Sequence, residues 1–364
     1  MVVDLKVFYL IQGVNTLLAI GFNLFLIFLA TVIVRTRLSS YSMIVIVYAL
    51  FEALYAIVTF VGMPVHFVSK GTWVVFNNLG LLAGTDFSFL GPSLFCIFYQ
   101  IWIILIVSHF VCRYIVVCKP NLSSRVKTSN GLKQLILFFY LFMTFFALTC
   151  GMILCTRQKI SETEYNSVVN DYKIPQHEGG HAFGYILLRP KDIDGSISLI
   201  GLTTILNHYA LVSTSFLIIS FCTFFVWREV RKLKKVGSMR RKKEAATQSR
   251  ILLSLLIQTA VPFIFCHIPS MIFLSIPFLQ SDFSFGQYSL IFTWTTTAVK
   301  FIDPLIVMAL VPDYRRAVCK VFGLKKIQES VSSILPASSY HSSNNGRTAP
   351  TSQNTEPASN YVNQ

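Results

Sequence analysis

Charged residues are scarce in this chain of 364 residues. Aspartate, glutamate, lysine and arginine make up 13% of it, and only 16 residues are acidic, whereas an ordinary soluble domain has about 25% charged residues. A soluble fold of this length would lack the polar groups that its surface needs. The hydrophobic content of 54% therefore indicates that lipid is the main solvent.

Cysteine also gives no sign of a secreted disulfide framework. The eight cysteines fall in or beside apolar runs or in the C-terminal region, and we interpret them as small buried hydrophobic residues.

Long stretches without charge divide the chain into seven predicted membrane-spanning helices. A charge at the bilayer centre costs at least about 2.5 kcal/mol, and a spanning helix needs about 20 apolar residues. The second span contains Glu52, and the seventh contains Lys300 and Asp303. The first span is too long for the apolar core of a signal peptide, so we expect it to be retained. The predicted spans are Val7–Val34, Leu38–Ser69, Phe87–Cys112, Gln134–Thr156, Gly195–Trp227, Ile251–Ser281 and Phe283–Pro312.

Lysine and arginine are concentrated in alternate loops, and this bias orients the bundle. Basic clusters at 35–37, 113–133, 228–250 and beyond Pro312 fall on one side, while the other loops are close to neutral. Because cytoplasmic loops carry the excess of lysine and arginine, we expect the N-terminus outside and the C-terminus in the cytoplasm. The predicted fold is an all-α membrane protein, a bundle of seven transmembrane helices.

The chain separates into two predicted parts. Residues 1–326 form the bundle with a short cytoplasmic helix, and residues 327–364, rich in Ser, Thr and Asn, form a disordered cytoplasmic tail. The tail is either a phosphorylation target or simply a solvated end. The basic run 228–243 lies beside the membrane, so we expect it to attract anionic lipid and predict no nucleic-acid partner.

Several motifs resemble those of rhodopsin-like G-protein-coupled receptors. The string Cys112-Arg113-Tyr114 is similar to the Asp-Arg-Tyr motif of that class, and Cys266-His267-Ile268-Pro269 is similar to its Cys-Trp-x-Pro motif. A more specific resemblance, to the nematode serpentine chemoreceptors of the Str type, rests on Pro64-Val65-His66, Cys118-Lys119-Pro120-Asn121, Leu256 to Pro262, Ile302-Asp303-Pro304-Leu305 and Asp313-Tyr314-Arg315.

This resemblance implies a chemosensory receptor in the plasma membrane, in the sensory cilium of a neuron. It would detect a small organic, odorant-like ligand and activate a heterotrimeric G protein. We expect no enzymatic activity and no cofactor. The alternative, a seven-helix channel or transporter, would show several inward charges or internal repeats, and the sequence has one compact charge cluster and no repeat.

Four departures from the rhodopsin-like pattern are present, and the first two carry predictions. The loop 156–194 has no cysteine, so the usual disulfide cannot form, and we expect this loop to be held by packing alone. Cys112 replaces the usual acid beside Arg113, which would lock the inactive state less firmly. The usual proline of the fifth helix is missing, and Val307 replaces the tyrosine after Pro304.

Two groups of residues are predicted to carry the signal. A switch network would include three buried charges, of which Lys300 and Asp303 lie three residues apart and within pairing reach; plain structural pairing is the alternative. Its predicted members are Asn23, Glu52, Lys300, Asp303 and Pro304. For Arg113 the alternative to G-protein contact is snorkelling at the membrane boundary. The predicted G-protein contacts are Arg113, Tyr114, Arg240, Arg241, Lys242 and Lys243.

The ligand pocket is expected between helices in the outer half of the bundle. Ordinary packing is the alternative role for each of its aromatic residues. The candidate ligand-binding residues are Cys96, Tyr99, Gln100, His208, His267 and Trp294.

Two other patterns suggest chemistry that the sequence does not support. His177-Glu178-Gly179-Gly180-His181 matches the zinc-protease motif, but Pro175 and two glycines disfavour the helix that would align both histidines. No metal site is therefore predicted. The retinal-bearing lysine of opsins lies seven residues before the helical proline, where this chain has Thr297, so Lys300 does not predict an opsin.

Overall fold

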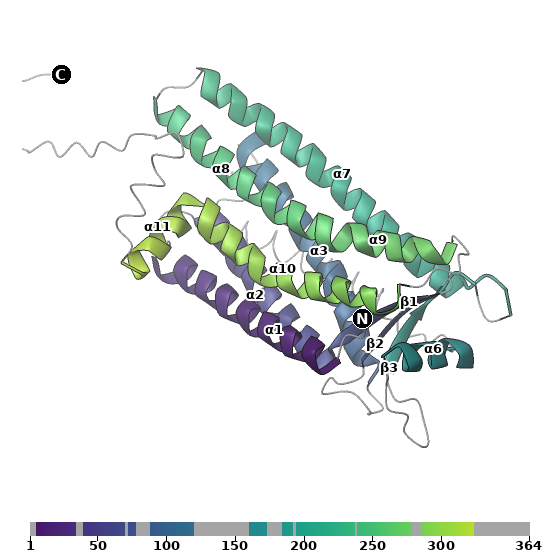
Figure 1. The fold of residues 1–364 in the computed structure, drawn as a ribbon. Helices are drawn as coiled ribbons and strands as arrows, with labels where there is room; N and C mark the ends of the chain where they lie inside the picture. The colour runs from purple at the N-terminus through teal and green to yellow at the C-terminus, as the bar shows by residue number, and fades with distance from the viewer. Residues whose placement is uncertain are drawn as a thin grey trace, which may run out of the picture. The chain divides into compact units, whose positions relative to one another are not determined.

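Six long apolar helices form a bundle in the computed structural model, which describes residues 5–33, 39–69, 72–77, 88–119, 160–172, 184–191, 194–236, 239–278 and 285–323 (Figure 1). Each is long and apolar enough to cross a membrane. The predicted fourth span, 134–156, lies outside the described residues. The six are α1 (Leu5–Phe28, continued by the π-helical η1, Leu29–Ile33), α2 (Ser39–Gly62), α3 (Leu90–Cys118), α7 (Leu199–Val236), α8 (Met239–Pro262, continued by the π-helical η2, Phe263–His267, and by α9, Ile268–Ser275) and α10 (Leu290–Leu310).

The helices pack in a closed sequence of neighbours. Helix α1 contacts α2 and α10, α2 contacts α3, α3 contacts α7, and α8 contacts both α7 and α10. Large apolar side chains point outward, as with Leu17 at 72% and Leu217 at 68% exposure, while Asn23, Glu52 and Lys300 are fully buried. This inside-out distribution is typical of a bundle whose solvent is lipid.

A three-stranded antiparallel sheet lies at one end of the bundle, here named the sheet end (Figure 1). Its strands are β1 (Pro64–Ser69), β2 (Thr72–Asn77) and β3 (Gly184–Leu188), in the order β1-β2-β3. The register pairs His66 with Val75, and Val75 with Ile186. Helix α6 (Glu162–Tyr172) and the 3-10 turns η3 (Ile276–Phe278) and η4 (Gly286–Ser289) lie at the same end.

Both faces of the sheet are buried, because its side chains alternate between two apolar clusters. Val68, Trp73 and Val75 join the core of the bundle. Phe67 and Phe76 join a second cluster on the other face, together with Val168, Val169 and Tyr172 of α6. The sheet is therefore a layer that closes one end of the bundle.

The sheet was not part of the all-helical prediction, and the predicted second span, Leu38–Ser69, extends seven residues too far. Helix α2 ends at Gly62, and Met63 has a positive φ of 36° before Pro64 begins β1. A Cβ added at Gly62 would lie 2.9 Å from the Cα of Gly91, so α2 and α3 meet where neither has a side chain.

At the opposite end, named here the far end, α3, α7 and α8 continue beyond the predicted spans, and α3 ends at Cys118. Helix α7 extends to Val236 and α8 begins at Met239, so the basic residues after Trp227 continue the helices of the bundle. The short helix α11 (Pro312–Val321) follows α10 directly. Its Tyr314 is buried, and burial raises the pKa of this phenol to about 12.

Candidate functional site

A small cavity lies between the sheet and the bundle at the sheet end. Its volume is about 40 Å³, enough for a few water molecules, whereas pockets for small organic molecules usually measure about 300–1,000 Å³. An organic ligand would therefore have to displace side chains. The lining residues come from β1, β2, β3, α3, α7, α9 and α10: His66, Trp73, Phe95, Cys96, Tyr99, Gln100, Leu188, Thr204, His208, Leu274 and Phe292.

His66 contributes a hydrogen-bond donor to this cavity. Its Nδ1 accepts a hydrogen bond of 3.1 Å from the indole N–H of Trp73, so in the neutral ring the proton must be on Nε2. Burial lowers the pKa of His66 to about 3, which keeps the ring neutral at physiological pH. Within the described structure Nε2 has no hydrogen-bond partner.

Gln100 contributes an acceptor to the same cavity. Its Oε1 is buried and has no partner among the described residues. Buried polar atoms are paired in the great majority of cases. Two unpartnered atoms of opposite hydrogen-bonding character, on His66 and Gln100, therefore mark the cavity as a place for a polar group that the described part of the chain does not supply.

A chain of hydrogen bonds leads from the cavity into the sixth span. The hydroxyl of Tyr99 lies 2.7 Å from Nδ1 of His267 and donates to Oγ of Ser270 at 3.2 Å. Nε2 of His208 lies 3.2 Å from the same Ser270 oxygen. Three residues predicted to bind ligand, Tyr99, His208 and His267, are thus joined in one network.

His267 ends the π-helical segment η2, in which the backbone is wound more loosely than in an α-helix. Pro269 follows and has no N–H to offer the carbonyl of Phe265, its partner four residues back. The hydroxyl of Thr295 on α10 donates to that carbonyl at 2.9 Å. The irregular part of the sixth span is therefore stabilised by its neighbour, α10.

The structure brings most of the predicted ligand residues to one place and moves one elsewhere. Cys96, Tyr99, Gln100 and His208 line the small cavity, and His267 contacts it through Tyr99. Trp294 instead packs on Phe8 in the second apolar cluster, which lies on the face of the sheet that packs against α6. Sequence reasoning missed the contribution of the strands, since His66 stood out there only as part of a family motif.

A second polar cluster lies deeper, between α2, α3 and α10. The hydroxyl of Tyr48 donates to Oδ2 of Asp303 at 2.9 Å. The indole N–H of Trp102 lies 2.9 Å from that hydroxyl and 3.3 Å from Oε1 of Glu52. Tyr48 and Trp102 thus connect the two buried carboxylates, and neither was predicted as a member of this network.

Lys300 has different partners from the one expected. Its Nζ donates to Oγ1 of Thr59 at 2.7 Å and lies 3.5 Å from the ring centre of Tyr55. The expected pairing with Asp303 is absent from the described ion pairs. Lys300 binds α2 by a hydrogen bond and a cation–π contact, while Asp303 binds α2 through Tyr48.

Arg113 links α3 to α8 at the far end of the bundle. It is buried, and its guanidinium donates to Oε1 of Gln248. The neighbouring Tyr114 packs against Phe221 and Phe225 of α7. Although Cys112 offers no acid, Arg113 therefore has a partner on another helix, which sequence reasoning did not anticipate.

Comparison with known proteins assigns the chain to a family. The model of the family described as serpentine type 7TM GPCR chemoreceptor Str matches residues 8–319. The chain belongs to this family. It is a multi-pass membrane protein with the seven-transmembrane fold of G-protein-coupled receptors.

Individual relatives of this receptor agree with the family. Serpentine receptor class r-10 of Caenorhabditis elegans is 23% identical over 308 residues, covering 81% of this chain and 86% of the relative. The Caenorhabditis briggsae protein of the same name is 21% identical and covers 80% and 83%. The crystal structure of squid rhodopsin has a TM-score of 0.61 at 14% identity, covering 92% of this chain and 93% of rhodopsin, which shows the shared fold.

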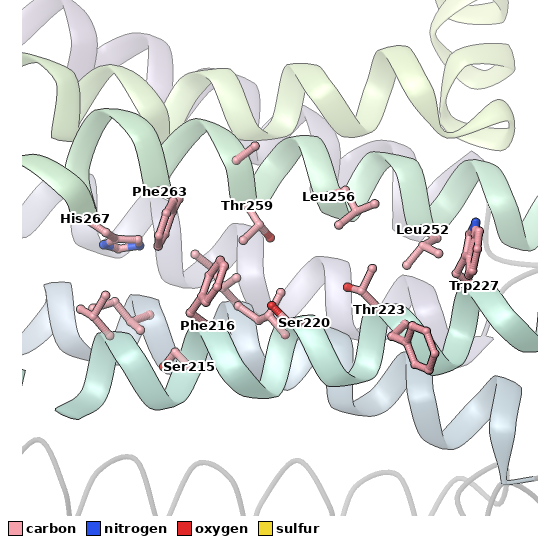
Figure 2. A pocket seen from close by; sticks show the side chains of 16 residues that line it. Ser215, Phe216, Ser220, Thr223, Trp227, Leu252, Leu256, Thr259, Phe263 and His267 are labelled. Carbon is pink, nitrogen blue, oxygen red and sulfur yellow. The ribbon is translucent and has the colours of Figure 1, made fainter. Parts of the chain in front are cut away.

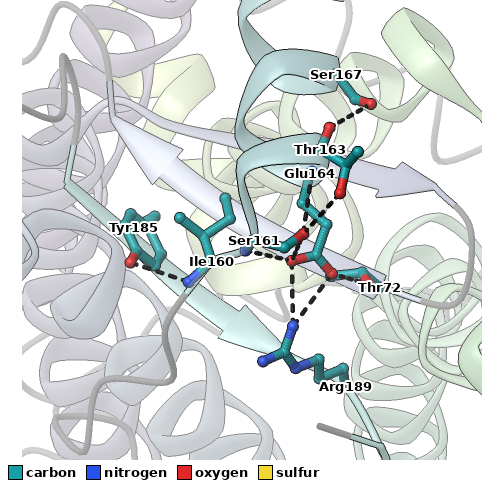
Figure 3. Close-up of polar contacts among 8 residues, drawn as sticks. All are labelled: Thr72, Ile160, Ser161, Thr163, Glu164, Ser167, Tyr185 and Arg189. Carbon is teal, nitrogen blue, oxygen red and sulfur yellow. Dashed lines mark hydrogen bonds and ion pairs between the residues drawn. The ribbon is translucent and has the colours of Figure 1, made fainter. Parts of the chain in front are cut away.

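In this receptor a polar clasp holds the segment between the fourth and fifth spans, so the prediction that packing alone holds it was wrong (Figure 3). Ser161 and Glu164 form a reciprocal capping box at the start of α6. The carboxylate of Glu164 also accepts from Thr72 of β2 at 2.7 Å and pairs with Arg189, after β3, at 3.1 Å. One carboxylate thus joins α6 to two strands.

Three predicted features of the receptor cannot be placed. The segment 177–181 with its histidine pair and the tail 327–364 lie outside the described residues. The side chains of Arg240, Arg241, Lys242 and Lys243 do as well, although the backbone there belongs to α8.

Proposed function

We propose that this receptor detects a small uncharged organic molecule in the cavity at the sheet end and activates a heterotrimeric G protein at the far end. The observation that carries the proposal is the pair of unpartnered buried atoms, Nε2 of His66 and Oε1 of Gln100, that line one cavity. The proposed location is the plasma membrane of a sensory cilium, as the family resemblance implies.

The cavity favours a neutral ligand with a single polar group. No charged side chain is among the described residues that line it, and His66 is neutral because burial keeps its pKa at about 3. A carbonyl would accept from His66, and a hydroxyl would also donate to Gln100. Phe95, Leu188 and Phe292 surround these atoms and suit a short hydrocarbon remainder.

The hydrogen-bond network offers a route from ligand to G protein. A ligand that displaces Tyr99 disturbs its contact with His267 at the end of the π-helical segment. That segment continues into α8, which carries Gln248, the partner of Arg113. Release of the Arg113–Gln248 contact would separate α3 and α8 at the far end and expose a surface for the G protein.

The proposal requires the sheet end to face outward, as the distribution of lysine and arginine predicts. An epitope at the N-terminus should be labelled on intact cells, and one at the C-terminus only after permeabilisation. The reverse pattern would remove the receptor mechanism, because the basic loops could not meet a G protein.

A ligand screen in cells with a G-protein reporter tests the recognition step. The panel contains ketones, alcohols and alkanes of matched carbon number. We expect carbonyl or hydroxyl compounds to activate and the alkanes to fail. His66→Phe and Gln100→Leu should reduce this selectivity, while Trp294→Phe, outside the cavity, should retain it.

Two results would contradict the proposal. Activation by alkanes equal to that by ketones would remove the role of the polar atoms. A ligand-dependent ion flux without any G-protein response would favour the channel or transporter alternative, which the family assignment disfavours.

A further inference from the structure

A larger cavity of about 540 Å³ lies between α3, α7 and α8, away from the sheet (Figure 2). The cavity runs along α7, α8 and η2, from His267 at one end to Trp227 at the other. Apolar residues such as Ile103, Leu252 and Leu256 make up most of its wall. The volume is within the range of about 300–1,000 Å³ that accommodates organic ligands.

This groove opens toward the outside of the bundle. Phe216, Phe224 and Trp227 line it and are about half exposed. In a membrane-spanning chain the outside of these helices meets the hydrocarbon region of the bilayer. The groove is therefore accessible to acyl chains.

The groove is longer than the hydrocarbon depth of one leaflet. Val212 and Trp227 both line it and are 15 positions apart on α7, which corresponds to about 22 Å of helix. One leaflet contributes about half of a hydrocarbon thickness of about 30 Å. An acyl chain that starts near Trp227 can thus lie in the groove over its full depth in the leaflet.

The Trp227 end of the groove is polar and basic. The hydroxyl of Thr223, one helical turn from Trp227, is buried and has no partner within the described structure. Arg228 and Arg231 follow on α7 and are exposed, and the guanidinium carbon of Arg231 lies 4.3 Å from the centre of the Trp227 ring. This order, apolar groove, unpartnered hydroxyl, indole and then arginines, matches the order of groups in an anionic phospholipid.

We propose that the α7–α8 groove binds an anionic phospholipid of the bilayer. One acyl chain occupies the groove, the ester group lies near Thr223 and Trp227, and Arg228 and Arg231 bind the phosphate. Arginine suits phosphate because its donors form a planar fork. A small apolar ligand would fill the groove without any use for the basic end, which favours the lipid as occupant. The proposal is independent of the odorant and of the G protein.

Quenching of tryptophan fluorescence by brominated lipid tests the site. The full-length receptor is placed in phosphatidylcholine nanodiscs that contain a fixed fraction of brominated phosphatidylserine or of brominated phosphatidylcholine. The Trp227 signal is the difference between the native chain and Trp227→Phe. We expect brominated phosphatidylserine to quench Trp227 at a lower mole fraction than brominated phosphatidylcholine does. The difference should be roughly fivefold for each arginine that binds the phosphate.

Matched variants separate the parts of the site. The double variant Arg228→Gln/Arg231→Gln should remove the preference for phosphatidylserine, whereas Lys320→Gln, an exposed cation on α11, should retain it. Ala260→Phe, which fills the groove from its wall, should reduce quenching by both lipids. Leu217→Phe, on the exposed side of α7 and outside the groove, should not.

Three outcomes would overturn the proposal. Equal quenching by the two lipids in the native chain would leave the arginines without a role. Unchanged quenching in Ala260→Phe would place the lipid outside the groove. Relief of quenching by a soluble apolar compound, with no dependence on headgroup, would assign the groove to a small-molecule ligand instead.

Discussion

The side-chain amide of Asn23 donates a hydrogen bond of 3.0 Å to the main-chain carbonyl of Lys300. That carbonyl lies four residues before Pro304, which is inside α10 and has no N–H to offer it. Asn23 of α1 thus satisfies a carbonyl that the proline leaves unpaired, in a region where water cannot do so. Thr295 does the same for Phe265, four residues before Pro269.

Replacing Asn23 by alanine should therefore destabilise the receptor by about 1–3 kcal/mol, the cost of an unsatisfied buried carbonyl. In the Pro304→Ala background an N–H is restored to α10, so the same replacement should cost much less. Thermal unfolding of the four purified proteins gives the coupling energy. Additive effects would show that Asn23 and Pro304 act independently.

The Glu164 clasp predicts a stability effect at the sheet end. Glu164→Gln weakens the contact with Arg189 and the capping box of α6 together, and both groups are largely buried. We expect a loss of about 1–3 kcal/mol. Lys232→Gln breaks an ion pair that is exposed and should cost less than about 1 kcal/mol. Equal unfolding midpoints for both variants would mean that packing alone holds α6.

His66 predicts a pH dependence of stability. Burial lowers its pKa to about 3 in the folded receptor, whereas the unfolded chain titrates near 6.5. Between pH 6.5 and pH 3 the unfolded state binds a proton at His66 and the folded state does not. The free energy of unfolding therefore falls by up to about 1.4 kcal/mol for each pH unit. His66→Phe lacks this loss.

The measurement is the difference in unfolding midpoint between His66→Phe and the native receptor as a function of pH. As the pH falls below 6.5, we expect the unfolding midpoint of the variant to rise relative to that of the native receptor. Above pH 7.5 we expect the difference between the two midpoints to be constant. A difference that is constant across the whole range would show that His66 is accessible to protons.

The contact between Arg113 and Gln248 predicts a change in basal signalling. Gln248→Leu removes the acceptor of Arg113 and should raise ligand-independent activity of the G-protein reporter. Gln248→Glu offers a charged acceptor, which binds arginine more strongly, and should lower it. Arg113→Ala should change signalling with surface expression nearly intact. Normal signalling in all three variants would assign Arg113 to a boundary role.

Replacing His267 should affect ligand potency more than it affects folding. His267→Phe keeps an aromatic ring but removes the nitrogen that contacts Tyr99, so we expect a larger shift in ligand potency or selectivity than in surface level. Tyr99→Phe removes the hydroxyl of the same contact and should shift potency in the same direction. Poor surface expression with unchanged potency would make His267 a structural residue.

Much of the bundle could be predicted from the sequence, because in lipid each spanning helix is determined by its own run of apolar residues. A charge-free run of about 20 residues has to form a helix that pairs its own backbone groups, so the spans that become α1, α3, α7 and α10 were readable one by one. The motifs at Arg113, His267 and Asp303 identified the family. The sheet was not predicted, because β1 and β2 are short segments whose described side chains are buried and mostly apolar. Periodicity cannot distinguish such segments from the ends of helices.

The sequence alone determined that this chain is a helical membrane protein of the chemoreceptor family, because the lengths of apolar runs and the spacing of motifs are properties of the linear sequence. Only the tertiary structure decided which distant groups meet. It brought His66 of a strand and Gln100 of α3 to one cavity, with Trp294 outside the lining of that cavity. It also placed the amine of Lys300 against Thr59 rather than against Asp303. A hydrogen bond needs two atoms within about 3 Å, and that distance is set by how helices and strands pack, not by spacing along the chain.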